Sequence, residues 1–164
     1  MKKYLIICLV LCTTSLLAQR DWSGPKGNEP LPEKLQNVRR AIDVINFPKE
    51  NDPIKIGDRY YWKHLTSILC KESPVEIIDY GAYLFYDGTW NLRKSYPLKE
   101  LDKTFGSKKQ QLLQGTPYSW TDNQRIGKNL YGGWALWYFI GITEDGETIC
   151  GYDTINTTTH LLNN

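Results

Sequence analysis

The histidines and cysteines are the residues of this sequence best suited to nucleophilic or metal chemistry. His64 and His160 lie far apart in the chain, and neither stands at a spacing from a cysteine that a zinc site would use. The sequence holds no Gly-x-Ser-x-Gly elbow, no glycine-rich phosphate loop and no His-Glu-x-x-His helix. It therefore predicts no metal site, no cofactor and no catalytic residue.

Carboxylates offer a second kind of chemistry. A glycoside hydrolase needs only two acidic groups at a suitable separation, and Asp79 with Asp87 is one such pair in the sequence. However, Asp87 and Asp145 each precede a glycine at an expected hairpin, where aspartate favours the turn conformation. A turn role is the stronger interpretation, and a hydrolase acting on cell-wall or glycan substrates stays as an alternative.

Most aromatic residues of this sequence carry a polar group, because there are six Trp and eleven Tyr against four Phe. Trp and Tyr combine a large contact area with a polar group, so they concentrate at binding surfaces. Trp134 and Trp137 belong to an apolar run and are expected in the core. Trp90, Tyr118 and Trp120 stand beside turns and polar residues, and they are the speculative binding residues.

Residues 1–18 have the pattern of a cleavable secretory signal. Lys2 and Lys3 precede an apolar run from Tyr4 to Leu11, polarity returns before Ser15, and Leu16-Leu17-Ala18 closes the segment, so the apolar run is shorter than the roughly 20 residues of a membrane span. We expect an exported product, periplasmic or extracellular, with no membrane span in the mature chain. Lys2 and Lys3 are the only charged side chains of this segment, and together they account for the formal net charge of +2. The mature chain is therefore neutral, which argues against a nucleic-acid partner.

Cys70 and Cys150 are the two cysteines left after the signal. An oxidising compartment favours joining such a pair, so we expect a disulfide. The bond would close a loop of about 80 residues and contribute roughly 4 to 5 kcal/mol. Two buried thiols are the alternative, because spacing does not give geometry.

Hydrophobic periodicity predicts the organisation of the chain. Residues 19–32 are rich in glycine and proline and are expected to form a flexible arm before a single domain over residues 33–164. Apolar residues recur at helical spacing over 33–46, which predicts an N-terminal amphipathic helix. Residues 58–70 fit either a helix or a strand, and a helix is slightly favoured.

From residue 75 onward the sequence is typical of β-structure with one short helix. Pro97 and Gly106 bound an apolar pattern of two helical turns. The last strands form a hairpin whose first strand is apolar on both sides and therefore central in the sheet. The remaining expectations are strands at 75–80, 82–86, 89–95, 110–114 and 118–121, a loop at 122–133, and the hairpin at 134–143 and 147–155.

Together these patterns predict an α+β fold. An N-terminal helix and a short second helix would pack on an antiparallel sheet that ends in a C-terminal hairpin. The expected function is that of a small exported binding protein, foremost an inhibitor or immunity-type protein that neutralises a toxin or hydrolase by binding it. Its partner is then another protein, and a glycan-binding or envelope accessory module is a further alternative.

Overall fold

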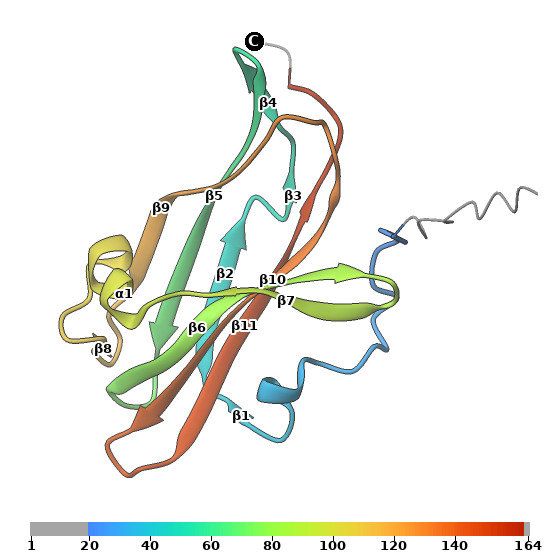
Figure 1. Cartoon of the computed structure of the whole chain (residues 1–164). Coiled ribbons are helices and arrows are strands. Elements are labelled where there is room, and N and C mark those ends of the chain that lie inside the picture. Colours follow the sequence, from blue (N-terminus) through green and yellow to red (C-terminus); the bar gives the residue numbers. More distant parts are fainter. Residues whose placement is uncertain (1–19, 163–164) are drawn as a thin grey trace, which may run out of the picture.

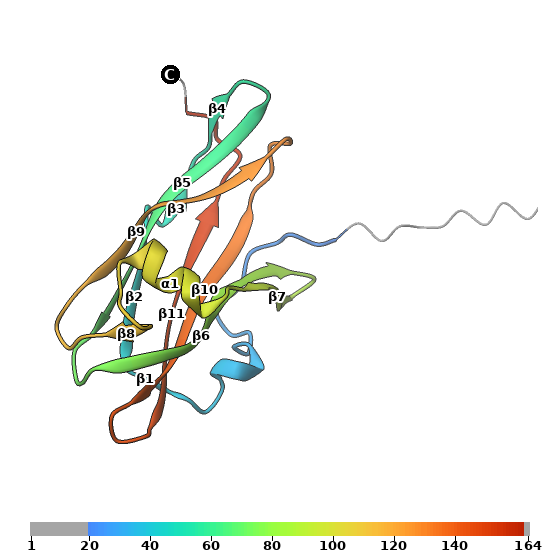
Figure 2. The ribbon, with the colours of Figure 1, turned by 60° about the vertical axis from the view of Figure 1, so that its left-hand side comes forward.

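The computed structural model describes residues 20–162, and these are mostly β-structure (Figures 1 and 2). The helical parts are one α-helix, α1 (Leu98–Phe105), and one 3-10 turn, η1 (Glu33–Leu35). The strands are β1 (Arg39–Arg40), β2 (Ile42–Phe47), β3 (Glu50–Asn51), β4 (Ile54–Ile56), β5 (Arg59–Cys70), β6 (Val75–Tyr86), β7 (Thr89–Ser95), β8 (Gln111–Leu112), β9 (Tyr118–Gly127), β10 (Gly133–Thr143) and β11 (Thr148–Thr157).

The strands form two sheets. The first has the order β1-β11-β10-β6-β7, with β3 paired to β11 and β8 to β6, and the second has β2-β5-β4, with β9 also paired to β5. Short contacts join the sheets at β2 and β11, including a hydrogen bond from the Asn46 amide to Oδ2 of Asp153. On the other side β7 pairs with β6 and β9 with β5, so the sheets remain open between β7 and β9.

The main core lies between the sheets and is covered by α1. Tyr80 of β6 and Phe139 of β10 stack with ring centroids 5.7 Å apart, and Phe105 of α1 meets Phe139 edge-on at 5.4 Å. Gly106 ends the helix in the left-handed conformation at φ 77°, which a glycine adopts without steric cost. The predicted short helix is confirmed.

The first sheet is also covered on its outer face. Leu35 of η1 and the neighbouring segment pack there against Tyr83, Leu136 and Tyr138. Strand β10 is paired on both edges and buried on both faces, which explains its continuous apolar sequence. The predicted closing hairpin and its central position are therefore confirmed.

The predicted α+β fold with an N-terminal helix is wrong. Only Glu33–Leu35 forms a helical turn, and residues 39–47 are extended. Along β2 burial alternates, with Ile42 fully buried and Ile45 56% exposed. The apolar residues of this segment matched a helical period and a strand period at once. Its β-branched side chains suit a strand, and pairing with β5 decided between the two.

Two further sequence predictions are corrected. The segment 58–70 is not a helix, because Arg59–Cys70 forms strand β5, with alternate side chains directed between the sheets. Strand β9 runs on to Gly127, through much of the predicted loop at 122–133.

The N-terminal part of the described chain lies against the β6–β7 hairpin. The amide of Asp21 donates to Oδ1 of Asp87 at 2.8 Å, and the rings of Trp22 and Tyr86 lie 5.2 Å apart. The predicted secretory signal at residues 1–18 lies outside the described residues. Within residues 20–162, no helix has the length and apolar character needed to cross a membrane.

A pair of substitutions tests the strand at 42–47. A helix would direct both Ile42 and Ile45 to the core, whereas the strand buries only Ile42. Urea unfolding should show that Ile42→Ala lowers the free energy of unfolding by about 2 to 5 kcal/mol. Ile45→Ala should change it by less than about 0.5 kcal/mol. Equal losses for both variants would contradict the strand.

Candidate functional site

A hollow between the two sheets, beside the opening between β7 and β9, is the candidate functional site. It encloses about 60 Å³, enough for a few water molecules. Tyr96, Trp120 and Trp137 form an aromatic wall, with Tyr96 stacked on Trp137 at 5.7 Å and Trp120 edge-on to Trp137 at 5.7 Å. The other lining residues are His64, Ala82, Leu84, Arg93, Asn123, Gln124, Arg125, Ala135, Ile155 and Thr157.

His64 lines this hollow and is itself almost fully buried. The side chain is 7% exposed, and Nδ1 lies 3.4 Å from the carbonyl oxygen of Trp62. A carbonyl oxygen only accepts, so Nδ1 carries the proton and donates. Burial lowers the pKa of His64 to about 4, so the ring is neutral at pH 7 and Nε2 is an acceptor. This Nε2 has no hydrogen-bond partner in the structure.

Arg125 supplies a partly buried positive charge. It lies opposite Trp62 in the β5–β9 register, and Nη1 donates to Oγ1 of Thr157 at 2.9 Å. Its Cζ is 4.0 Å from the ring centroid of Tyr131 and 5.6 Å from that of Trp62. Burial lowers the pKa of Arg125, and the charge of Arg93 acts in the same direction.

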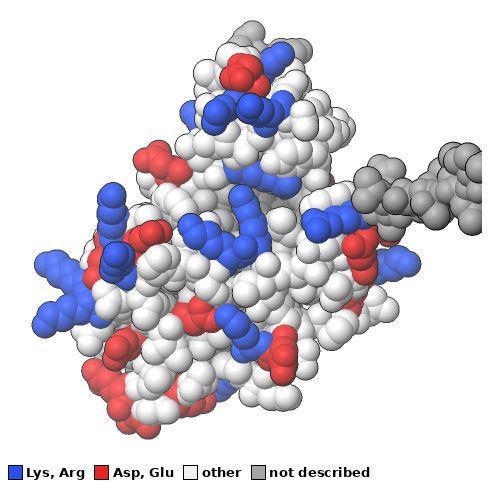
Figure 3. Space-filling model, in the orientation of Figure 1, with Lys and Arg blue, Asp and Glu red and all other residues white. Residues whose placement is uncertain are grey.

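No acidic side chain balances this charge in the described part of the chain. The ion pairs of residues 20–162 are formed by Lys34, Arg39, Lys49 and Lys71. Figure 3 shows basic side chains gathered near the middle of one face, with acidic ones set mainly around them. A partly desolvated guanidinium without a carboxylate is a strong attractor for an anion.

A wider hollow of about 360 Å³ adjoins Arg125 on the outside and is lined by Trp22, Arg125, Tyr131 and Gly132. Arg125 is a lining residue of both hollows. A side-chain Cβ at Gly127 would lie 2.7 Å from the hydroxyl oxygen of Tyr131. Glycine at this position therefore allows the Tyr131 ring to lie against β9 and cover the guanidinium.

A chain of buried hydrogen bonds fixes the strands behind the pocket. Nδ2 of Asn123 donates to Oγ1 of Thr66 at 2.9 Å, and that hydroxyl donates to Oδ1 of Asn46 at 2.8 Å. Nδ2 of Asn46 then donates to the carbonyl oxygen of Asp153 at 3.0 Å. The chain links β9, β5, β2 and β11, and buried networks of this kind hold their strands rigidly.

The structure does not bring the three speculative binding residues together. Trp120 lines the pocket. Tyr118 packs against the inter-sheet core, and its hydroxyl accepts a hydrogen bond from the Leu113 amide at 3.2 Å. Trp90 packs against the cluster on the outer face of the first sheet, with its ring 5.0 Å from Phe85. These aromatic residues therefore form no common surface.

Sequence reasoning missed the polar residues of the pocket. His64 shares a strand face with Trp62, and that alternation was visible in the sequence. Arg125 gave no such signal, because its segment was expected to be a loop. Trp137 is buried as expected, whereas Trp134 is only partly buried and lies against Gly24.

The aspartates considered for hydrolysis have structural partners. Oδ2 of Asp79 lies 2.7 Å from Nζ of Lys34, and the hydroxyl of Tyr138 donates to its Oδ1 at 3.1 Å. Asp87 sits in the β6–β7 turn and accepts from the Asp21 amide. Neither aspartate lines the pocket.

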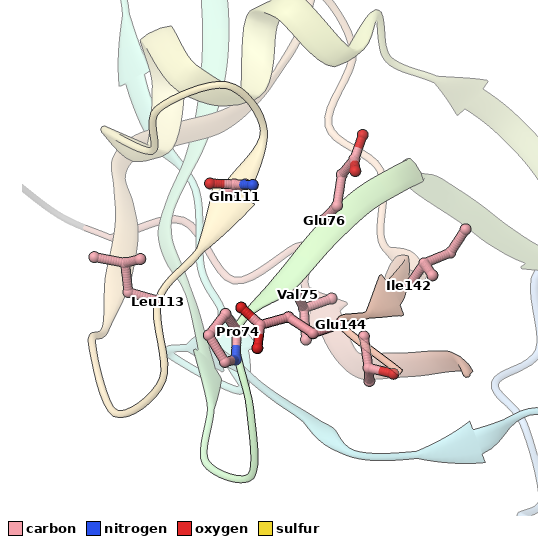
Figure 4. Close-up of a pocket in the computed structure, with 8 residues that line it drawn as sticks. Pro74, Val75, Glu76, Gln111, Leu113, Ile142 and Glu144 are labelled. Carbon is pink, nitrogen blue, oxygen red and sulfur yellow. The ribbon is translucent and has the colours of Figure 1, made fainter. Parts of the chain in front are cut away.

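Another hollow, of about 200 Å³, holds two glutamates. Glu76 lies on β6, and Glu144 lies in the turn that follows β10. Figure 4 shows that their carboxylates point away from one another. They do not form the facing pair that acid–base hydrolysis of a glycoside requires.

The structure holds Cys70 and Cys150 as free thiols, without the predicted disulfide. Cys70 packs between the sheets, whereas Cys150 belongs to the cluster on the outer face of the first sheet. A Cβ at Gly151 would lie 2.6 Å from Cβ of Ile42, so Gly151 faces inward and Cys150 outward. Burial raises the pKa of Cys70 to about 11 and also raises that of Cys150, so both thiols are protonated at pH 7.

Residues 20–162 contain no group of three or more His, Cys, Asp or Glu side chains placed to hold a metal ion.

No protein-family model matches the chain, and no curated protein matches it. Among solved structures, the chain is similar to an X-ray structure of a Northeast Structural Genomics Consortium target. The TM-score is 0.48 at 10% identity, over 77% of this chain and 96% of that one. A likeness of this extent carries no argument about function.

The buried neutral state of His64 should make stability depend on pH. Its folded pKa of about 4 lies below the ordinary value of 6.5, so the unfolded chain binds the extra proton between these values. Stability from this group is therefore complete above pH 6.5 and falls by about 3 kcal/mol as the pH drops to 4. Urea unfolding of His64→Gln should lack this part of the pH dependence, and exposed His160→Gln is the control. Parallel pH profiles for the wild type and His64→Gln would contradict the assignment.

Proposed function

We propose that the chain is an exported, non-catalytic binding protein whose inter-sheet pocket takes up a small anionic ligand. The observation that carries the proposal is Arg125, a partly buried cation that packs on aromatic rings and has no acidic partner among residues 20–162. An incoming carboxylate or phosphate would supply the missing negative charge and form charge-assisted hydrogen bonds.

The shape of the site supports a small ligand. Arg125 lines both the inter-sheet hollow of about 60 Å³, which has room only for a small group, and the wider hollow of about 360 Å³, which is within the range of small-molecule sites. Aromatic side chains line both hollows, and a guanidinium presents a planar fork that binds carboxylates in a fixed orientation.

Binding accounts for the polar groups better than catalysis does. Asp79 and Asp87 are engaged in structural hydrogen bonds, and both thiols are protonated at pH 7.

The export part of the proposal rests on the signal-like pattern of residues 1–18. N-terminal sequencing of secreted protein should start near Gln19, and intact Met1 would contradict export.

A protein-binding role of the inhibitor or immunity type is the second candidate. It is favoured by the outer face of the second sheet, where Ile45, Phe47 and Ile126 are 56%, 67% and 43% exposed. Exposed apolar patches of this kind often mark protein contacts. The two candidates differ in the substitution that abolishes binding, which is Arg125→Gln for the pocket and Phe47→Asp for the sheet face.

Benzoate, a simple planar carboxylate, tests the pocket. In NMR titrations of the protein, benzoate should shift the indole N–H signals of Trp120 and Trp137, which line the inner hollow. Arg125→Gln should weaken binding at least about tenfold, because it removes a charge-assisted hydrogen bond. Arg59→Gln, on exposed β5 sequence, is the matched control and should bind like the wild type. Shifts confined to other tryptophans, or unchanged binding by Arg125→Gln, would contradict the proposal.

A further inference from the structure

The N-terminal segment of the described chain, residues 20–31, supplies one wall of the wider hollow. This segment, named here the strap, has no helix or strand, and most of its residues are exposed. Its Trp22 lines the hollow together with Arg125, Tyr131 and Gly132. The Trp22 side chain is 40% exposed, so part of its surface is free to contact a bound molecule. One wall of the proposed ligand site therefore lies outside the two sheets.

The contacts that hold Trp22 in place lie at the tip of the β6–β7 hairpin and at the start of β10. The amide of Asp87 donates to the carbonyl oxygen of Asp21 at 2.7 Å, and the Trp22 ring lies 5.2 Å from that of Tyr86. The indole also covers the backbone of Gly133, where a Cβ would lie 3.3 Å from it. An exposed segment held by a few surface contacts opens at a low cost in free energy, whereas the packed sheets behind it do not.

The sizes of the two hollows divide a ligand into two parts. Arg125 lines both of them. The inter-sheet hollow, at about 60 Å³, has room only for a small group such as a carboxylate. The wider hollow, at about 360 Å³, has room for a ring, and the aromatic side chains of Trp22 and Tyr131 line it.

We infer that the ligand is an acid with a flat, apolar body, and that Trp22 of the strap closes over this body. The acid group pairs with Arg125, and the body lies in the wider hollow against Trp22 and Tyr131. The inference rests on the proposed function. It adds the class of the ligand body, the residue that selects it, and a coupling between ligand binding and docking of the strap.

The coupling follows from the position of Trp22. A ligand that contacts the indole only while the strap is docked binds the docked state more tightly. By reciprocity, the bound ligand makes undocking of the strap rarer by the same factor. A small anion without a body contacts Arg125 alone and leaves the strap unaffected.

Acetate and benzoate test the selection of the body, because they share a carboxylate and differ in the ring. In NMR titrations the wild-type chain should bind benzoate about tenfold more tightly than acetate, since an aromatic ring gains from stacking and from burial of apolar area. Trp22→Ala should remove this advantage and leave acetate binding within about twofold. Trp22→Phe keeps a ring and should recover part of the advantage. Thermal unfolding checks that each variant folds.

Limited proteolysis tests the coupling in the wild-type chain and needs no variant. Trypsin cleaves after Lys26, which lies in the strap, and cleavage reports the population of the undocked state. Saturating benzoate should slow cleavage after Lys26 at least about fivefold, whereas acetate at the same concentration should not. Cleavage after Lys109, which is exposed and lines neither hollow, controls for a direct effect on trypsin.

The outcomes separate the inference from the proposed function. If both acids bind through Arg125 with equal affinity, or if the advantage of benzoate persists in Trp22→Ala, the inference is wrong and the proposed function stands. Cleavage after Lys26 that is unchanged in saturating benzoate also overturns the inference. If neither acid binds the wild type, both fail.

Discussion

The burial of β10 on both faces is the constraint on which the structure depends. Its inner face forms the main core with the second sheet and α1, and its outer face is covered by η1 and the segment beside it. The second sheet therefore packs across the inner face and meets the first at β2 and β11. The opposite edges, β7 and β9, stay apart, and the pocket lies beside this opening.

The pocket contains one charged group that the fold leaves without a counter-ion. Arg125 is held by Thr157 and by the faces of Tyr131 and Trp62, and these contacts fix its position without neutralising its charge. A partly buried charge without a counter-ion is unfavourable for folding, and in the proposed function it is kept because it binds the ligand.

The sequence predicted those elements whose signals are local. Pro97 and Gly106 bound the short helix, and the apolar run from Trp134 identified the central strand. It failed over residues 33–46, because Ile42 and Ile45 fit a helix locally and only pairing with distant β5 makes them a strand. The sequence did not predict the candidate site for the same reason. The β5–β9 register places Arg125 opposite Trp62, and no local pattern reveals it.

The central claim is that Arg125 serves binding rather than folding, and the free energy of unfolding of Arg125→Met without ligand tests it most directly. Methionine keeps apolar contact with Tyr131 and Trp62 but removes the unbalanced charge, and replacing a buried charge with an apolar group is often neutral or stabilising. The account predicts that stability in urea is unchanged or increases. A loss of about 2 kcal/mol or more would show that the fold itself needs the guanidinium, and would contradict the account.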